Sequence, residues 1–92
     1  MDSAAPLTIV DQVIGFQREI DYGTWNDANR QEWRALCQIL LDQLTGSAKF
    51  EQWLEAKLAQ FDGLASDSDR IRIADEINQA VRTWKRYQRR SK

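Results

Sequence analysis

The strongest structural signal in the chain is residues 33–44, WRALCQILLDQL. Apolar residues recur there three and four positions apart, which places them along one face of an α-helix. The aligned residues are Trp33, Leu36, Cys37, Leu40, Leu41 and Leu44. This pattern predicts a helix that buries one side against other helices.

The rest of the chain repeats this helical spacing. Gly23, Gly46 and Gly63 separate the periodic segments, and glycine is the usual residue just past a helix end. No segment alternates apolar and polar residues with a period of two, so no strand is predicted. The sequence therefore predicts one all-α domain over residues 1–92, a compact bundle of about four antiparallel helices without a β-sheet. The expected helices cover about 8–22, 25–45, 48–62 and 67–90.

Composition excludes several kinds of chemistry. The 92-residue chain has no His and a single Cys, Cys37, which rules out His-dependent catalytic pairs, the usual zinc sites and an intrachain disulfide. Neither a Gly-x-x-x-x-Gly-Lys-Ser/Thr loop nor a Gly-x-Gly-x-x-Gly loop is present. We therefore expect no enzymatic activity, no metal or other cofactor and no small-molecule substrate. Cys37 stands among leucines and is predicted to be a core residue.

Neither a membrane span nor a secretory signal is predicted. The longest uninterrupted apolar run is Ile39-Leu40-Leu41, far short of the roughly 20 residues that a membrane-spanning helix requires. Residues 1–6, MDSAAP, begin with an acid and lack the apolar segment of a signal peptide. We expect a cytoplasmic protein.

Charge is distributed very unevenly along the chain. Residues 1–81 carry seven basic and all fourteen acidic residues, whereas residues 82–92 carry six basic residues and no acid. On a helical wheel, five of these cations fall within about 140° of arc. The candidate polyanion-binding residues are Arg82, Lys85, Arg86, Arg89, Arg90 and Lys92.

Two explanations of this basic segment stay open. Cations in the last turn of a helix complement its macrodipole, at about 0.3–1 kcal/mol each, and this accounts for two or three of them. It leaves unexplained five cations on one face without an acid four positions before them to relieve their repulsion. Guanidinium groups make paired hydrogen bonds to phosphate oxygens, which favours a polyanionic partner such as nucleic acid.

Several apolar residues lie outside the positions that a four-helix monomer needs to bury. Trp25 lies where a loop becomes a helix, and Ile39 lies off the stripe of its own segment. Val10 and Ile14 widen the stripe of the first segment. We expect these four residues to form an interface with a partner protein or a second copy. The alternative is that single apolar residues are simply exposed, as they often are.

These observations favour a small, non-enzymatic helical subunit of a larger assembly. It would dock on other proteins through apolar helix faces and contact nucleic-acid phosphates, without reading the sequence, through residues 82–92. The small all-helical subunits of CRISPR effector complexes have this general size and role, although the comparison rests on class alone, with no matching motif. The alternative is a protein-only adaptor or regulator, a homodimer whose basic helix binds an acidic protein surface.

Overall fold

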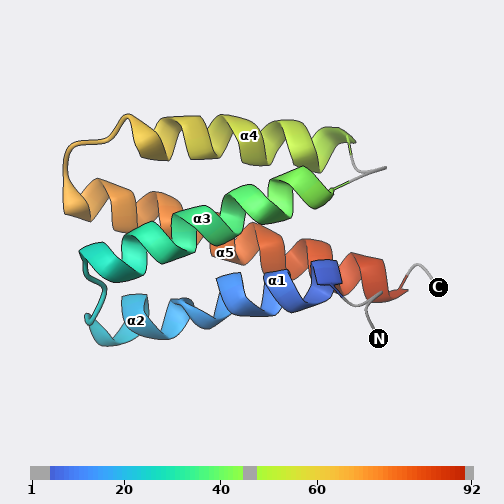
Figure 1. Ribbon diagram of the computed structural model, residues 1–92, viewed down its shortest axis with the longest axis horizontal. Helices are drawn as coiled ribbons and strands as arrows, with labels where there is room; N and C mark the ends of the chain where they lie inside the picture. Colours follow the sequence, from blue (N-terminus) through green and yellow to red (C-terminus); the bar gives the residue numbers. More distant parts are fainter. Residues whose placement is uncertain (1–4, 45–47, 91–92) are drawn as a thin grey trace.

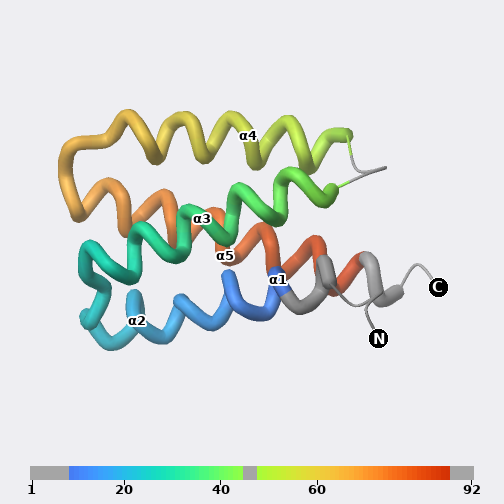
Figure 2. Tube along the Cα trace, viewed as in Figure 1, coloured from blue at the N-terminus to red at the C-terminus, as the bar shows by residue number. Residues whose placement is uncertain are grey.

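The computed structural model describes residues 5–44 and 48–90, with side chains described for 9–44 and 48–87 (Figures 1 and 2). Helices account for most of this chain, and the described ranges contain no strand. The helices are α1 (Ala5–Gly15), α2 (Gln17–Tyr22), α3 (Asp27–Gln43), α4 (Ala48–Asp62) and α5 (Asp67–Arg90). The predicted all-α fold is confirmed.

The helices form an up-and-down bundle. Helix α1 packs against α3 and α5, and α4 packs against the same two helices from the other side (Figure 1). The chain reverses direction at each loop, so α1 runs antiparallel to α3 and α4 runs antiparallel to α5 (Figure 2). Helix α5 follows the whole length of the bundle and carries its basic end beside α1.

Most helix boundaries agree with the prediction. Helices α4 and α5 begin at the expected residues, and the side chain of Ser66 caps α5 by accepting a hydrogen bond from the Asp69 backbone N–H at 3.3 Å. Helix α3 begins two residues later than predicted. Its N-cap is Asn26, whose side chain accepts from the backbone N–H of Asn29 at 2.8 Å. Asn is among the preferred N-cap residues because its side-chain oxygen satisfies one of the free N–H groups.

The first predicted helix, residues 8–22, is wrong in two respects. Helix α1 already begins at Ala5, and a break at Phe16 separates it from α2. The Phe16 N–H donates to the Val13 carbonyl at 3.2 Å, a tighter turn than the α-helix makes. Gly15 lies within this turn, and glycine is a common site of helix kinks. The kink allows the Phe16 ring to pack edge-on against Trp25, with ring centroids 6.5 Å apart.

The core is an apolar cluster with Trp33 near its centre. The Trp33 ring is fully buried and contacts the rings of Trp25 at 5.9 Å and Phe61 at 5.0 Å. Farther along the bundle, Phe50 stacks on Trp84 at 5.4 Å. The buried apolar residues are Val10, Val13, Trp33, Cys37, Leu40, Leu44, Leu54, Leu58, Phe61, Ile73, Ala74, Ile77 and Val81. Trp33 and Cys37 are therefore core residues, as the sequence predicts.

One polar network crosses this core. Asn78 of α5 is 2 % exposed, and its side-chain oxygen accepts a hydrogen bond from Trp33 Nε1 at 2.9 Å. The Asn78 amide group donates in turn to Gln17 Oε1 at 2.9 Å, and Gln17 Nε2 donates to Asp75 at 2.6 Å. The network joins α2, α3 and α5 and so fixes the position of α2 on the bundle.

Candidate polyanion-binding surface

The basic end of α5 is exposed where the structure describes it. Arg82 and Arg86 lie one helical turn apart, and both are exposed, whereas Ile77 and Val81 of the same helix are buried. Helix α5 thus presents one face to the core and these two guanidinium groups to solvent. Arg89 and Arg90 belong to the last turn of α5, but their side chains lie outside the described residues, as does all of Lys92.

Lys85 differs from its neighbours because it has an acidic partner. Its Nζ forms an ion pair with Asp11 of α1, and only 24 % of the Lys85 side chain is exposed. The pair links the basic end of α5 to α1. Asp11 therefore offsets the Lys85 charge, and Lys85 is a weaker candidate for contact with a polyanion than Arg82 or Arg86.

The structure adds Arg18 to the candidate residues. Arg18 is exposed on α2 and lines a surface hollow of about 370 Å³ together with Arg82 of α5. The two residues are 64 positions apart in the sequence, so a helical wheel of either segment could not place them together. We call Arg18, Arg82 and Arg86 the basic surface.

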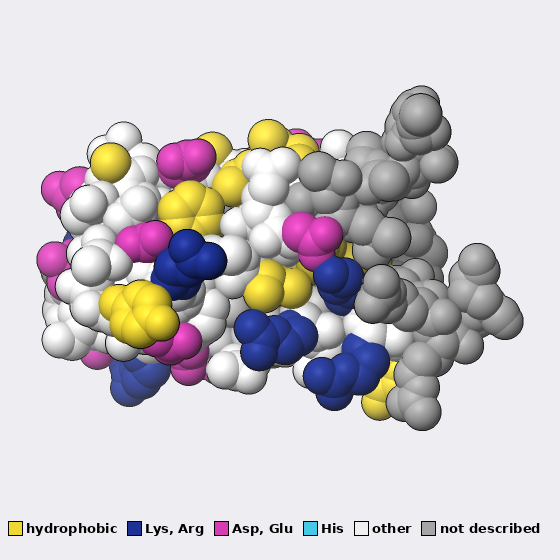
Figure 3. Space-filling model, turned by 90° about the horizontal axis from the view of Figure 1, so that it is seen from below, with side chains coloured by type: hydrophobic (Ala, Val, Ile, Leu, Met, Phe, Trp, Pro, Cys, Tyr) yellow, Lys and Arg dark blue, Asp and Glu magenta, His cyan; other side chains and the backbone are white. Residues whose placement is uncertain are grey.

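Acidic partners distinguish the basic surface from the rest of the molecule. Within the described side chains, the cations that form ion pairs are Arg30, Arg34, Lys57, Arg70, Arg72 and Lys85. The described cations without an ion pair are the three residues of the basic surface and Lys49 of α4. Figure 3 shows the bundle from the side of α1 and α2, where separate Lys and Arg side chains lie between the left centre and the lower right of the view.

The hollow itself has a mixed lining. Ile14 and Gly15 contribute from α1, and Gln17, Asp21 and Tyr22 from α2. Gly15 leaves open space, because a Cβ atom added there would meet nothing within 4 Å. Tyr22 is 76 % exposed, the largest fraction among the exposed large hydrophobic residues. The hollow therefore combines two guanidinium groups, one carboxylate and one exposed aromatic ring.

The predicted apolar interface needs correction. Val10 is fully buried in the core, so the prediction that it contacts a partner is wrong: both apolar edges of α1 face the bundle. Trp25 is partly buried and packs against Phe16 and Trp33, which commits much of its ring to the core. Ile14 is also partly buried. Ile39, at 41 % exposed, remains available to a partner.

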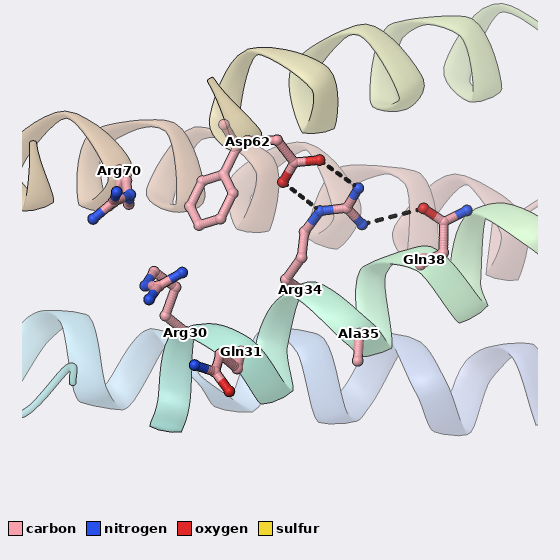
Figure 4. Close-up of a pocket in the computed structure, with 8 residues that line it drawn as sticks. Arg30, Gln31, Arg34, Ala35, Gln38, Asp62 and Arg70 are labelled. Atoms are coloured by element: carbon pink, nitrogen blue, oxygen red, sulfur yellow. Dashed lines mark hydrogen bonds and ion pairs between the residues drawn. The ribbon is translucent and has the colours of Figure 1, made fainter. Parts of the chain in front are cut away.

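A second hollow, of about 460 Å³, lies between α3, the end of α4 and the start of α5 (Figure 4). It contains more arginines than the first hollow, but each has its own carboxylate. Arg34 Nε and Nη2 donate to the two oxygens of Asp62 at 2.9 Å each. Arg30 pairs with Asp27 and Arg70 with Asp67. Three carboxylates thus offset three guanidinium groups. The Arg34–Asp62 pair joins α3 to α4, whereas the other two pairs each lie within one helix.

The Arg34–Asp62 pair also changes the acidity of its members. The hydrogen bonds from Arg34 hold the pKa of Asp62 below its usual range, because they stabilise the charged carboxylate. The same contact raises the pKa of Arg34. Both groups therefore stay charged at neutral pH and hold the end of α4 against α3.

Other kinds of site find little support in the described residues. Among them, no group of His, Cys, Asp and Glu side chains is placed to hold a metal ion. None of their helices combines the length and apolar character that crossing a bilayer requires. Burial raises the pKa of the Cys37 thiol, so this group stays protonated and is a poor nucleophile. No protein-family model, curated protein or solved structure matches the chain.

Proposed function

We propose that this protein is a non-enzymatic helical subunit that binds nucleic-acid phosphates, without reading the sequence, through the basic surface. One observation carries the proposal. Arg18, Arg82 and Arg86 are exposed on two neighbouring helices without an ion pair among the described side chains, whereas nearly every other described cation has an acidic partner. Mutual repulsion of cations costs stability unless an anion relieves it, so a phosphate-bearing partner fits this surface.

The chemistry of the basic surface favours phosphate contacts over base recognition. Guanidinium groups bind phosphate oxygens through paired hydrogen bonds. Such contacts fix a protein on nucleic acid but carry no sequence information. The sequence-predicted residues Arg89, Arg90 and Lys92 follow Arg86 along the chain and would add to these contacts. Lys85 would contribute less, because Asp11 offsets its charge.

Ile39 of α3 is an exposed apolar residue through which the subunit would dock on other proteins. A subunit needs a second surface for its protein neighbours, and Ile39 is 41 % exposed on a helix that does not contribute to the basic surface. The rival hypothesis, an adaptor whose cations bind an acidic protein, uses the same arginines. The test must therefore compare nucleic acid with an acidic polypeptide.

The experiment is a salt titration of binding, measured by fluorescence anisotropy with labelled single-stranded RNA and duplex DNA. The parent chain is compared with the triple variant Arg18→Gln, Arg82→Gln, Arg86→Gln. Substitutions are preferable to deleting residues 82–92, because Trp84 stacks on Phe50 and its loss would disturb the fold. Lys49→Gln is the matched control, since Lys49 is exposed and makes no described ion pair, but lies on α4.

We expect the parent to bind, with an affinity that falls steeply as salt rises. Each lost phosphate contact should lower the slope of log K against log salt by about 0.9 on duplex and about 0.7 on single strands. The triple variant should therefore bind at least tenfold more weakly at low salt, and Lys49→Gln should match the parent. Failure of the folded parent to bind either nucleic acid would overturn the proposal, and binding to poly-glutamate alone would establish the rival.

A further inference from the structure

Packing within the fold does not explain the exposed position of Tyr22. It ends α2, directly before Gly23, which has a φ of 73° and reverses the chain toward α3. Of the nine aromatic rings in the chain, all but Tyr22 and Tyr87 are at least partly buried. Tyr22 is 76 % exposed and so forgoes the stabilisation that burial of its ring would give. An aromatic ring in this position is well suited to contact a ligand.

The neighbours of Tyr22 indicate what kind of ligand this is. Arg18 precedes Tyr22 by one turn of α2, which places the two side chains on the same helix face. Arg82 reaches the same hollow from α5, so two guanidinium groups lie in the same hollow as the ring. The combination of a basic groove and an exposed aromatic ring is typical of single-strand binding sites, where bases stack on side chains.

Resting on the proposed function, we infer that the ligand is single-stranded nucleic acid, with one base stacked on Tyr22 and the adjoining phosphates on Arg18 and Arg82. A base in a duplex has both faces covered by its neighbours, so an exposed ring on the protein surface cannot stack on it. In a single strand, each base can turn outward. Stacking on an aromatic ring tolerates any sequence, because every base has a flat face.

The remaining lining of the hollow fits a base better than a phosphate at its centre. The carboxylate of Asp21 accepts a hydrogen bond from Gln17 Nε2 at 3.0 Å and would repel a phosphate placed directly on it. A carboxylate can instead accept a hydrogen bond from a base amino group. Gly15 has no side chain, and the space next to its Cα is open. The base therefore occupies the middle of the hollow, between the two arginines.

The test compares two polyanions that share phosphates and differ in bases. One probe is a labelled 20-nucleotide single strand of mixed sequence, and the other is inorganic polyphosphate, used as a competitor of that strand. The variants are Tyr22→Ala and Tyr22→Phe, and the control is Gln43→Ala, which shortens an exposed side chain on α3 that does not line the hollow. Circular dichroism and thermal melting check that each variant folds, which we expect because Tyr22 is exposed.

We expect Tyr22→Ala to weaken binding of the single strand about 5- to 100-fold, the range for loss of one stacked base. Tyr22→Phe and Gln43→Ala should bind like the parent. Polyphosphate should compete equally well for the parent and for Tyr22→Ala once each competition curve is corrected for the affinity of the strand. A duplex of the same length should bind the parent more weakly than the single strand does.

Different results would contradict base stacking on Tyr22 and phosphate binding by the basic surface. If Tyr22→Ala binds the single strand as tightly as the parent while the Arg18, Arg82 and Arg86 variant does not, phosphate binding stands and base stacking is wrong. Equal affinity of the parent for duplex and single strand would also overturn the inference. If the parent binds neither the strand nor polyphosphate, the proposed function itself falls, and the inference falls with it.

Discussion

Trp33 Nε1 and Asn78 Oδ1 lie 2.9 Å apart and join α3 to α5 where both side chains are shielded from solvent. A buried donor and a buried acceptor satisfy each other there, and the Asn78 amide group goes on to donate to Gln17. This contact sets the register of α5 against two other helices. Purely apolar packing would allow more than one register, because similar side chains can exchange places.

Asn78→Ala tests how much this hydrogen-bond network contributes to the free energy of unfolding. The substitution leaves the Trp33 indole N–H and the Gln17 oxygen without partners in the interior and opens a small cavity. We expect a loss of about 2–3 kcal/mol in the free energy of unfolding, measured by urea denaturation. Gln79→Ala, on the exposed side of the same helix, should change it by less than about 0.5 kcal/mol. Equal losses in the two variants would contradict the assigned role of Asn78.

The helical content of this protein could be predicted because hydrophobic spacing is a local property. The run at 33–44 and its counterparts show which faces are apolar, and the structure buries Trp33, Cys37 and Leu40 accordingly. The sequence pattern does not predict the break at Phe16, because a wheel drawn through residues 8–22 assumes a straight helix. The predicted partner contact of Val10 is wrong for a related reason, since the two neighbouring helices α3 and α5 cover a wider face of α1 than one neighbour would.

The candidate site was harder to predict because it is made by pairs of distant residues. The sequence locates the cations of residues 82–92, but it does not show that Lys85 meets Asp11 or that Arg82 shares a hollow with Arg18. The sequence does not distinguish Asn78 from the other polar residues, because its hydrogen bond with Trp33 cannot be seen in the sequence. Such contacts depend on helix arrangement, which periodicity alone leaves open.

The Arg34–Asp62 pair predicts a specific response to acid. Its hydrogen bonds lower the pKa of Asp62 in the folded chain. The pair therefore stabilises the fold above the unfolded-state pKa of about 3.9, and the contribution is lost as pH falls through the lower, folded-state pKa. Because 51 % of the Asp62 side chain is exposed, we expect only about 0.5–1 kcal/mol from it.

Urea denaturation of the parent and Asp62→Asn at pH 7 and pH 2.5 measures this contribution. The parent should be the more stable at pH 7, and the difference should shrink at pH 2.5. Glu55→Gln, an exposed acid of α4 with no described ion pair, should show no such change between the two values. A stability difference of the same size at both would show that the contribution of Asp62 does not depend on its charge.

Cys37 should be protected from thiol reagents in the folded chain. The side chain is fully buried and its pKa is raised by that burial, so reaction requires opening of the bundle. We expect labelling by a disulfide reagent at pH 8 to be slow in buffer and rapid in denaturing urea. A labelling rate in buffer close to that of a free cysteine peptide would contradict burial of the thiol. Asn78→Ala should label faster than the parent, since a less stable fold opens more often.

The ion pair between Asp11 and Lys85 gives the most direct link between the fold and the proposed function. Asp11 holds the one described cation of residues 82–92 that has an acidic partner. Asp11→Asn should release the Lys85 ammonium toward a bound strand. The cost in stability should be at most about 1 kcal/mol, because 59 % of the Asp11 side chain is exposed and solvent weakens such a pair. We expect tighter binding of single-stranded RNA and a salt slope steeper by about 0.7, equivalent to one added phosphate contact.

A double-mutant cycle separates this effect from the mere loss of a negative charge. Lys85→Gln alone should weaken binding only slightly, because the Lys85 ammonium group already forms an ion pair with Asp11. In the Asp11→Asn background, the same change should remove most of the gain and return the slope to that of the parent. If Lys85→Gln lowers the slope equally in both backgrounds, Lys85 contacts phosphate despite its ion pair, and Asp11 acts only through its charge. The cycle therefore shows whether the ion pair with Asp11 keeps Lys85 from contacting phosphate.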